Sequence, residues 1–251
     1  MVDPHAVFVE PDNTNQKIWR YMDFTKFVDL LNSEELYFTR PDKFEDPFEG
    51  SLTQATVRDI LENFDGLPEQ RAHVQQQLTN GIYKNASTYL HGVNCWHMNE
   101  HESAGMWRLY LKSNEGIAIQ TSYAKLKQAL MPSPLTCYLG VVNYIDYDND
   151  ITGSDNLFIP LVHKRKHFEH ENEVRAVAPI AYNLPQRGNP RTPDQLHPGI
   201  KVGVSLKELI ERVYVSPNSP PWLSQLVRDT CQKFGFDFEV VNSRLSERPS
   251  Y

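Results

Sequence analysis

The sequence predicts an α+β fold in which helices flank a mixed or antiparallel central sheet. Expected strands and helices follow one another along the 251 residues without the regular alternation of a parallel βαβ sheet. The 12 Phe, 12 Tyr and 4 Trp supply enough apolar surface for a folded core. No repeat or flexible linker divides the chain, so we expect a single domain over residues 1–251, with a helical insertion at about 51–90.

The composition excludes several classes of protein. Lys and Arg number 25 against 32 Asp and Glu, and this net charge of -7 argues against binding duplex nucleic acid through a broad basic face. No apolar run approaches the ~18 residues that span a bilayer, and residues 1–5 lack the features of a signal peptide. The three cysteines are widely spaced and form no CxxC pair, which favours a reducing compartment. We therefore expect a cytoplasmic protein that makes no membrane contact.

The first fifty residues predict two short strands around one helix. The strands are Lys17–Tyr21 and Leu36–Thr39, and Asp23 is placed to cap the helix between them. Four apolar residues share one face of that helix, at helical spacing: Phe24, Phe27, Leu30 and Leu31. The following segment, 41–50, is acidic and rich in turn residues.

Two helices are expected in the insertion. The first has a helical stripe that predicts burial, formed by Val57, Ile60, Leu61 and Phe64, and Gly66 should stop it. Pro68 suits the first position of a second, polar helix that runs through Leu78. This pair would form a lid or a side lobe on the sheet.

The middle of the chain predicts alternating strands and helices. Ser122 should cap the helix that carries Leu126 and Leu130. The expected elements are a strand at Val93–His97, a helix at Ser103–Leu111, strands at Ile117–Thr121 and Cys137–Tyr147, a helix through Leu161 and a strand at Glu171–Ile180.

The last third begins with a capping-box pattern. Ser205 and Glu208 have the spacing of that motif, which opens a short helix with inward Leu206 and Leu209. The remaining expected elements are a strand at Val213–Ser216, a helix that starts at Ser219–Pro220 and closes at Gly235, and a strand at Phe236–Val240.

The strongest chemical signal is the charged segment 163–175. If a strand runs from Glu171, its alternation puts Glu171, Glu173 and Arg175 on one face. Two carboxylates beside a guanidinium suit the stabilisation of a polar or cationic transition state, and the proximity of like charges raises a carboxyl pKa into the range useful for acid–base work. The alternative is a solvated strand face whose charges form cross-strand ion pairs.

Other polar clusters are less specific. The basic run 164–167 suits a phosphate or a nucleic-acid backbone, or is a solvated helix end. The His97–His101 and His163–His167 pairs have zinc-ligand spacing, but no HExxH motif or cysteine pair accompanies them, so we expect no metal site. Ser103 is either a helix cap or a nucleophile. No Walker loop or GxGxxG motif occurs.

Several sequence segments together resemble those of a bacterial family known as domain of unknown function 2971. They cover nearly the whole chain in order: Trp19–Tyr21, Leu36–Gly50, Cys95, Met106–Tyr110, Glu115–Gly116, Phe168–Arg175 and Tyr214–Pro217. The name of that family assigns no function.

More distantly, the architecture resembles the ADP-ribosyltransferase-like fold. The resemblance implies that NAD is consumed, with Arg20 holding its pyrophosphate or ribose and a residue near 95–97 lining the nicotinamide pocket. Glu173 would stabilise the oxocarbenium ion, and Glu171 would orient the acceptor. The other implied NAD-binding residues are Tyr21, His97, Trp107 and Tyr110. This chain departs from the expected pattern because His97 replaces a serine and the middle strand has no Ser-Thr-Ser run.

Three functions stay open. The first is an NAD-consuming transferase or glycohydrolase, a toxin or anti-phage effector that modifies a protein or nucleic-acid acceptor, with Glu173, Glu171 and Arg175 as catalytic residues. The second is a metal-dependent nuclease or phosphodiesterase, in which Asp46 and Glu49 join the two later glutamates as Mg²⁺ ligands. The third is a non-catalytic regulatory or binding module. The partner favoured by the sequence is a small phosphate-bearing ligand.

Overall fold

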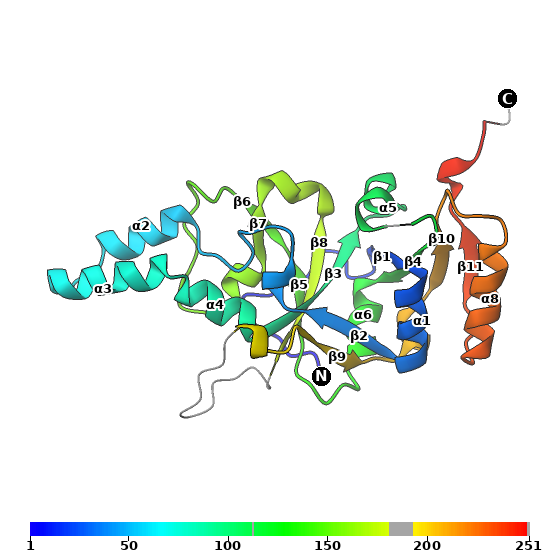
Figure 1. The fold of residues 1–251 in the computed structure, drawn as a ribbon, viewed down its shortest axis with the longest axis horizontal. Helices are drawn as coiled ribbons and strands as arrows, with labels where there is room; N and C mark the ends of the chain where they lie inside the picture. Colours follow the sequence, from blue (N-terminus) through cyan, green and yellow to red (C-terminus); the bar gives the residue numbers. More distant parts are fainter. Residues whose placement is uncertain (112, 181–192, 250–251) are drawn as a thin grey trace.

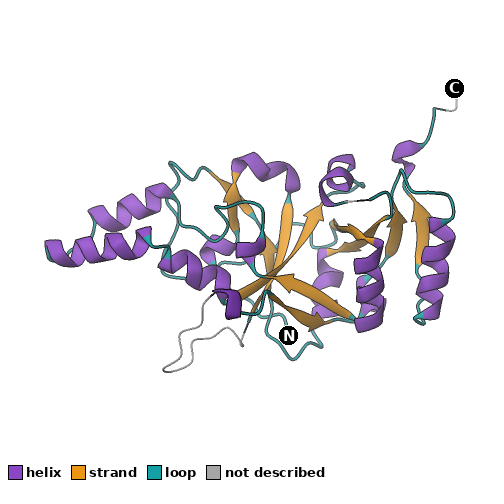
Figure 2. Ribbon diagram, in the orientation of Figure 1, coloured by secondary structure: helices purple, strands orange, loops and turns teal. Residues whose placement is uncertain are grey.

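A computed structural model, which describes residues 1–111, 113–180 and 193–249, confirms the α+β class. Its main sheet has nine strands and is mixed but largely antiparallel, with β10 and β11 as a parallel pair (Figures 1 and 2). Along the principal path, the strand order is β11-β10-β4-β1-β3-β2-β9, and β8 pairs with both β3 and β5. The strands are β1 (Lys17–Asp23), β2 (Glu35–Thr39), β3 (His91–Met98), β4 (Gly116–Ser122), β5 (Tyr138–Val141), β8 (Glu173–Pro179), β9 (Gly199–Gly203), β10 (Arg212–Val215) and β11 (Glu239–Asn242).

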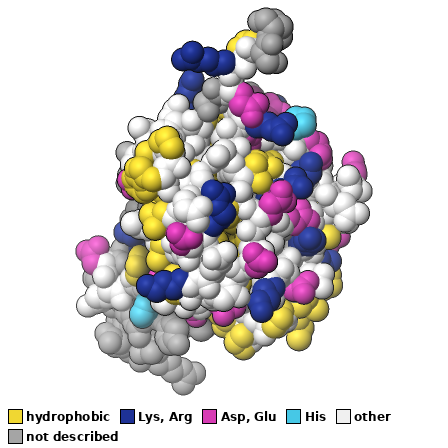
Figure 3. Space-filling model, turned by 90° about the vertical axis from the view of Figure 1, so that its right-hand side faces the viewer, with side chains coloured by type: hydrophobic (Ala, Val, Ile, Leu, Met, Phe, Trp, Pro, Cys, Tyr) yellow, Lys and Arg dark blue, Asp and Glu magenta, His cyan; other side chains and the backbone are white. Residues whose placement is uncertain are grey.

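Helices cover both faces of this sheet. The largest apolar cluster joins one sheet face to α1 (Phe24–Ser33), α6 (Tyr123–Leu130), α7 (Leu206–Leu209) and α8 (Leu223–Lys233). On the opposite face, α5 (Ala104–Tyr110) covers Trp19, Tyr21 and Ala118. A third cluster packs the N-terminal Phe8 against Val93 and Val177. At the β11 end, side chains of both charge signs are interspersed (Figure 3).

Different strands pair with β3 along its length. One edge of this strand pairs with β8 from His91 to His97. The other edge is shared, because β1 pairs only at His97 and Met98, whereas β2 pairs only at Val93. Among the described residues, no strand pairs with that edge at positions 94–96, so the strand pairing is interrupted where β1 and β2 diverge.

Three helices occupy the expected insertion: α2 (Gln54–Glu62), α3 (Pro68–Thr79) and α4 (Ile82–Tyr89). The α2–α3 pair projects beyond the sheet (Figure 1). The start of α3 at Pro68 is confirmed. The predicted buried stripe of α2 is wrong, because Val57, Ile60 and Leu61 are only half-buried and Phe64 lies beyond the helix. The projecting helix has too little of the sheet beneath it to bury a full face. The sequence patterns did not predict α4 or β9.

Two strand boundaries also differ from the prediction. The long strand expected at Cys137–Tyr147 is broken at Val142, and its second part, β6 (Asn143–Ile145), pairs instead with β7 (His163–Arg165) in a separate sheet. Glu171 ends the 3-10 helix η3 (Lys166–Glu171), so it is not on β8. Asn172, at φ 38°, makes the left-handed turn that separates them.

Some of the predicted helix-capping side chains form a capping hydrogen bond, and others do not. Ser103 and Ser122 each accept a hydrogen bond from a backbone amide of the helix that follows. Asp23 and Ser205 stand at N-caps, but their side chains make no capping hydrogen bond, so the capping box expected at Ser205 is not formed. The last long helix begins at Leu223, a few residues after the predicted start. No helix in the described ranges is long and apolar enough to cross a bilayer.

Candidate functional site

A buried ionic network lies on the β3–β8 face that carries Cys95 and His97. Arg175 binds Glu49 through two hydrogen bonds, of 2.7 and 2.9 Å, and its Nε donates to Glu173 at 2.8 Å. The Lys164 ammonium donates to Glu173 at 2.7 Å and to Glu171 at 2.9 Å. All five side chains are less than 10 % exposed. The prediction that Glu171, Glu173 and Arg175 lie together is therefore confirmed, although Glu171 belongs to a 3-10 helix rather than to the strand.

The two glutamates of this network differ in proton affinity. Burial alone would raise the pKa of Glu173, but Arg175 and Lys164 outweigh it and hold that pKa well below its usual range. Burial and the neighbouring charge of Glu173 raise the pKa of Glu171 to about 7, against the opposing effect of Lys164. A carboxylate that stays ionised therefore lies beside one that exchanges its proton near neutral pH.

Arg20 lies beside residues 94–96 of β3, where one edge of the strand pairs with no described strand. Its guanidinium donates to the Cys95 carbonyl at 2.8 Å, on the edge of β3 that β1 has left, and lies 5.9 Å from the centre of the Trp96 ring. In the part of the chain that the structure describes, no carboxylate pairs with it. Burial lowers the pKa of Arg20, but a guanidinium stays charged at any physiological pH. Arg20 thus keeps donors and a positive charge available to an anion.

The pKa values of Tyr110 and Cys95 respond to the charges of the ionic network. Burial raises the pKa of the Tyr110 hydroxyl, and the charges of Cys95, Glu173 and Glu171 act in the same direction while Arg20 opposes them. Burial likewise raises the pKa of the Cys95 thiol, with Glu173 adding to the effect. Tyr110 reaches this region from α5, and both groups are neutral at physiological pH.

His97 has one unused ring nitrogen. Its Nδ1 lies 2.6 Å from the carbonyl of Glu171, so Nδ1 carries the proton and donates. Burial lowers the pKa of His97 and keeps the ring neutral. Its Nε2 is buried and has no hydrogen-bond partner among the described residues. His97 is the cross-strand neighbour of Glu173. Its Nε2 is therefore a hydrogen-bond acceptor without a described partner beside the ionic network.

Tyr21 and Trp107 have different surroundings from Arg20. They pack edge to face, with ring centres 4.9 Å apart, beneath α5. The Tyr21 hydroxyl accepts a hydrogen bond from the Ser103 amide, and the Trp107 indole donates to Glu102. Both side chains are buried in a core cluster. Three surface pockets, of about 360, 500 and 820 Å³, include neither Arg20 nor Glu173 in their linings.

The basic run does not form one phosphate-binding patch. Lys164 is buried in the network, and Arg165 bonds Asp46 at 2.7 Å with its guanidinium over the Phe48 ring. Only the side chains of Lys166 and His167 are exposed. The expectation of a free cationic cluster is wrong, because a short strand turns two of its members towards buried carboxylates.

The metal-site alternatives find little support in the arrangement of side chains. Within the described ranges, no group of three His, Cys, Asp or Glu residues is placed to hold a metal ion. The four carboxylates considered as Mg²⁺ ligands each pair with a lysine or an arginine, since Asp46 bonds Arg165 and the other three bond Lys164 or Arg175. Ser103 acts as a helix cap.

Sequence reasoning missed two members of the network. Glu49 was considered only as an acidic-loop residue and a Mg²⁺ ligand, and Lys164 only as part of a basic run, yet both are buried in ion pairs with Arg175 or Glu173. Glu49 and Arg175 are 126 positions apart, so local periodicity carries no signal for their contact. The Tyr144 hydroxyl, which accepts from the Glu173 amide at 2.8 Å, was missed for the same reason.

A scan of protein-family models and searches of curated proteins and of solved structures give no match to this chain. Both resemblances drawn from the sequence therefore stay predictions.

Proposed function

We propose that this protein is an enzyme that consumes NAD and transfers ADP-ribose to water or to an acceptor. The observation that carries the proposal is that the Arg20 guanidinium has no carboxylate partner among the described residues and bonds to β3, the strand that pairs with Glu173, one of two neighbouring carboxyls of different proton affinity. The distant resemblance to the ADP-ribosyltransferase-like fold supplies NAD as the substrate class.

Arg20 would bind the pyrophosphate. A guanidinium offers several N–H donors in one plane and binds phosphate oxygens through paired hydrogen bonds. Arg20 uses one N–H donor on the Cys95 carbonyl, and its charge has no carboxylate partner within the described ranges. An anionic ligand would supply that missing partner. Tyr110, on α5, offers a neutral hydroxyl whose pKa is raised by burial, against the opposing effect of the Arg20 charge.

The carboxylates suit cleavage of the N-glycosidic bond. When the bond between ribose C1′ and the nicotinamide nitrogen breaks, its electron pair leaves with nicotinamide, and C1′ becomes positive. Glu173, kept ionised by Arg175 and Lys164, would stabilise that charge. Water or an acceptor hydroxyl would then add to C1′, and its proton would pass to ionised Glu171. Two neighbouring carboxyls with separated pKa values are a typical arrangement for such a division of roles.

A binding module without turnover is the second candidate. Its support is that both Glu173 oxygens already accept hydrogen bonds from Lys164 or Arg175. A network of this kind can simply hold together β7, which carries Lys164, β8, which carries Glu173, and the loop that contains Glu49. The protein would then hold a phosphate-bearing ligand at Arg20 and leave it intact.

Release of nicotinamide separates the two candidates. Purified protein is incubated with NAD, with and without EDTA, and free nicotinamide is measured by chromatography from pH 5 to about pH 9. We expect release that is insensitive to EDTA, and a kcat/KM that rises with pH up to about 7 and then levels, because Glu171 must be ionised to accept a proton.

The matched variants are Glu171→Gln and Glu169→Gln, since Glu169 is an exposed carboxylate of the same 3-10 helix. The first should lower the rate about a hundredfold and remove the pH dependence, and the second should change neither. Tight binding of ADP-ribose without any release of nicotinamide would support the binding module. Equal rates in wild type and Glu171→Gln would contradict the proposed chemistry.

A further inference from the structure

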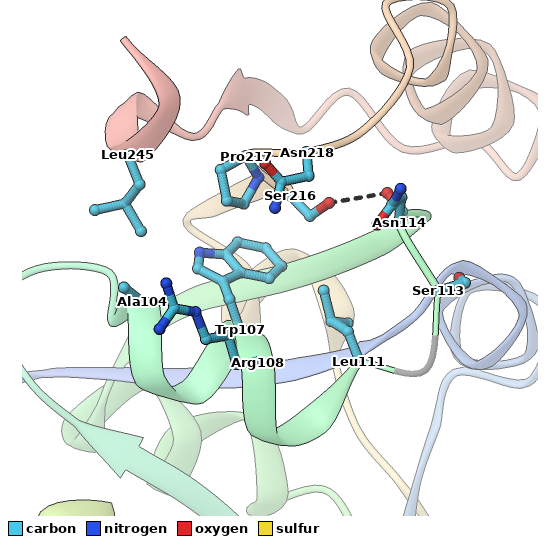
Figure 4. A pocket seen from close by; sticks show the side chains of 10 residues that line it. All are labelled: Ala104, Trp107, Arg108, Leu111, Ser113, Asn114, Ser216, Pro217, Asn218 and Leu245. Carbon is cyan, nitrogen blue, oxygen red and sulfur yellow. Dashed lines mark hydrogen bonds between the residues drawn. The ribbon is translucent and has the colours of Figure 1, made fainter. Parts of the chain in front are cut away.

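A second ligand site is suggested by a pocket that lies apart from Arg20 and the ionic network. It has a volume of about 360 Å³ and is formed by α5, the turn that precedes β4, the loop after β10 and the 3-10 helix η6 (Arg244–Ser246). Figure 4 shows the Trp107 indole beneath Pro217, with Leu111 on one side and Leu245 on the other. This volume is at the lower end of the range for ligand pockets, so it suits a molecule much smaller than a dinucleotide.

The pocket is held together by contacts from distant parts of the chain. Glu102 accepts from the Trp107 indole at 2.9 Å and from the Arg244 backbone amide at 3.0 Å, which ties η6 to the start of α5. On the opposite wall, the Ser216 hydroxyl donates to the Asn114 carbonyl at 2.9 Å (Figure 4). Two walls are therefore fixed by hydrogen bonds that leave the interior of the pocket free.

The lining has a distinct charge. In a chain of net charge -7, the described residues that line this pocket include no Asp or Glu and one cation, Arg108. Arg108 is exposed and forms no ion pair with any described residue. Asn114 and Asn218 add side-chain amides, whereas Trp107, Leu111, Pro217 and Leu245 are apolar.

We infer that this pocket binds a small aromatic carboxylate. The guanidinium of Arg108 matches a carboxylate through two parallel hydrogen bonds, and the apolar walls take up the ring. The two asparagine amides are available to polar groups on the ring. The inference does not depend on the proposed function, because it uses neither Arg20 nor the glutamates of the network.

Calorimetric titration without NAD tests the inference. The probe is indole-3-acetate, and its matched control is the neutral indole-3-acetamide. We expect the acid to bind at least about tenfold more tightly than the amide, because only the acid forms charge-assisted bonds with Arg108. No binding of the acid at millimolar concentration, or equal binding of acid and amide, would overturn the inference.

Three variants locate the binding. Arg108→Gln should weaken indole-3-acetate about tenfold, and Ala104→Phe should weaken it by filling the pocket. Arg71→Gln removes the same charge from exposed α3, outside the three pockets, and should have no effect. Thermal unfolding of each variant checks the fold. Full affinity in folded Arg108→Gln would show that the acid binds elsewhere and would end the proposal.

Discussion

At the scale of single residues, burial decides what each charged side chain does. Arg175 and Arg212 each form an Arg–Glu bond shorter than 3 Å, but the Arg175 side chain is fully buried and that of Arg212 is 48 % exposed. Arg20 differs from both, because it is partly buried and has no acidic partner in the described chain. A charge that folding leaves without a partner is a better indication of a ligand than one that is already neutralised.

Removing a buried cation should therefore cost far more stability than removing an exposed one. Arg175→Met leaves three buried carboxylates, Glu49, Glu171 and Glu173, with Lys164 as the one remaining cation of the network, so the free energy of unfolding should fall by ~3–5 kcal/mol. Arg212→Met breaks one exposed pair and should change stability little. Urea unfolding followed by circular dichroism measures both. Similar losses in the two variants would contradict this view of the network.

At the scale of secondary-structure elements, local patterns predicted where elements occur better than how they end. Strands β1, β3, β4 and β10 and helices α5 and α6 lie close to their predicted positions because each has a clear periodicity. The break at Val142 and the turn at Asn172 were not predictable in this way, since both depend on pairing with strands distant in sequence. The interrupted strand pairing beside Arg20 has the same origin, because it depends on which strand pairs with each part of β3.

The helix caps provide a test at this scale. Ser122 accepts a hydrogen bond from the Lys125 amide, whereas Ser205 has no side-chain capping bond despite its capping-box sequence. Ser122→Ala should lower the free energy of unfolding by about 1 kcal/mol, and Ser205→Ala should lower it clearly less. Thermal or urea unfolding of the two variants decides the matter, and a larger loss in Ser205→Ala would show that the capping box does form.

At the scale of the whole molecule, stability is concentrated in the sheet and the helices that cover it. The main apolar cluster joins strands and helices from nearly the full length of the chain, whereas α3 has no buried residue. The amphipathic pattern of the core helices was readable from the sequence. The outward projection of α2 and α3 could not be predicted, because an amphipathic helix has the same sequence pattern whether it packs on a core or in a side lobe.

Hydrogen exchange should reflect this distribution. Amides of α3 should exchange at least about a hundredfold faster than those of β3 and β8, because α3 can open without unfolding the sheet. Mass spectrometry of peptides from the exchanged protein measures the rates. Equal protection of α3 and β3 would show that the projecting helices unfold only with the core.

The affinity for ADP-ribose tests the central claim most directly, namely that Arg20 is the anion anchor of the site. Calorimetry compares wild type with Arg20→Gln, which keeps a donor for the Cys95 carbonyl, and with Lys17→Gln, which removes an exposed cation from the same strand. We predict that wild type binds ADP-ribose, that Arg20→Gln binds at least about tenfold more weakly, and that Lys17→Gln binds as wild type does. Absence of binding to folded wild type, or unchanged affinity in Arg20→Gln, would contradict the account.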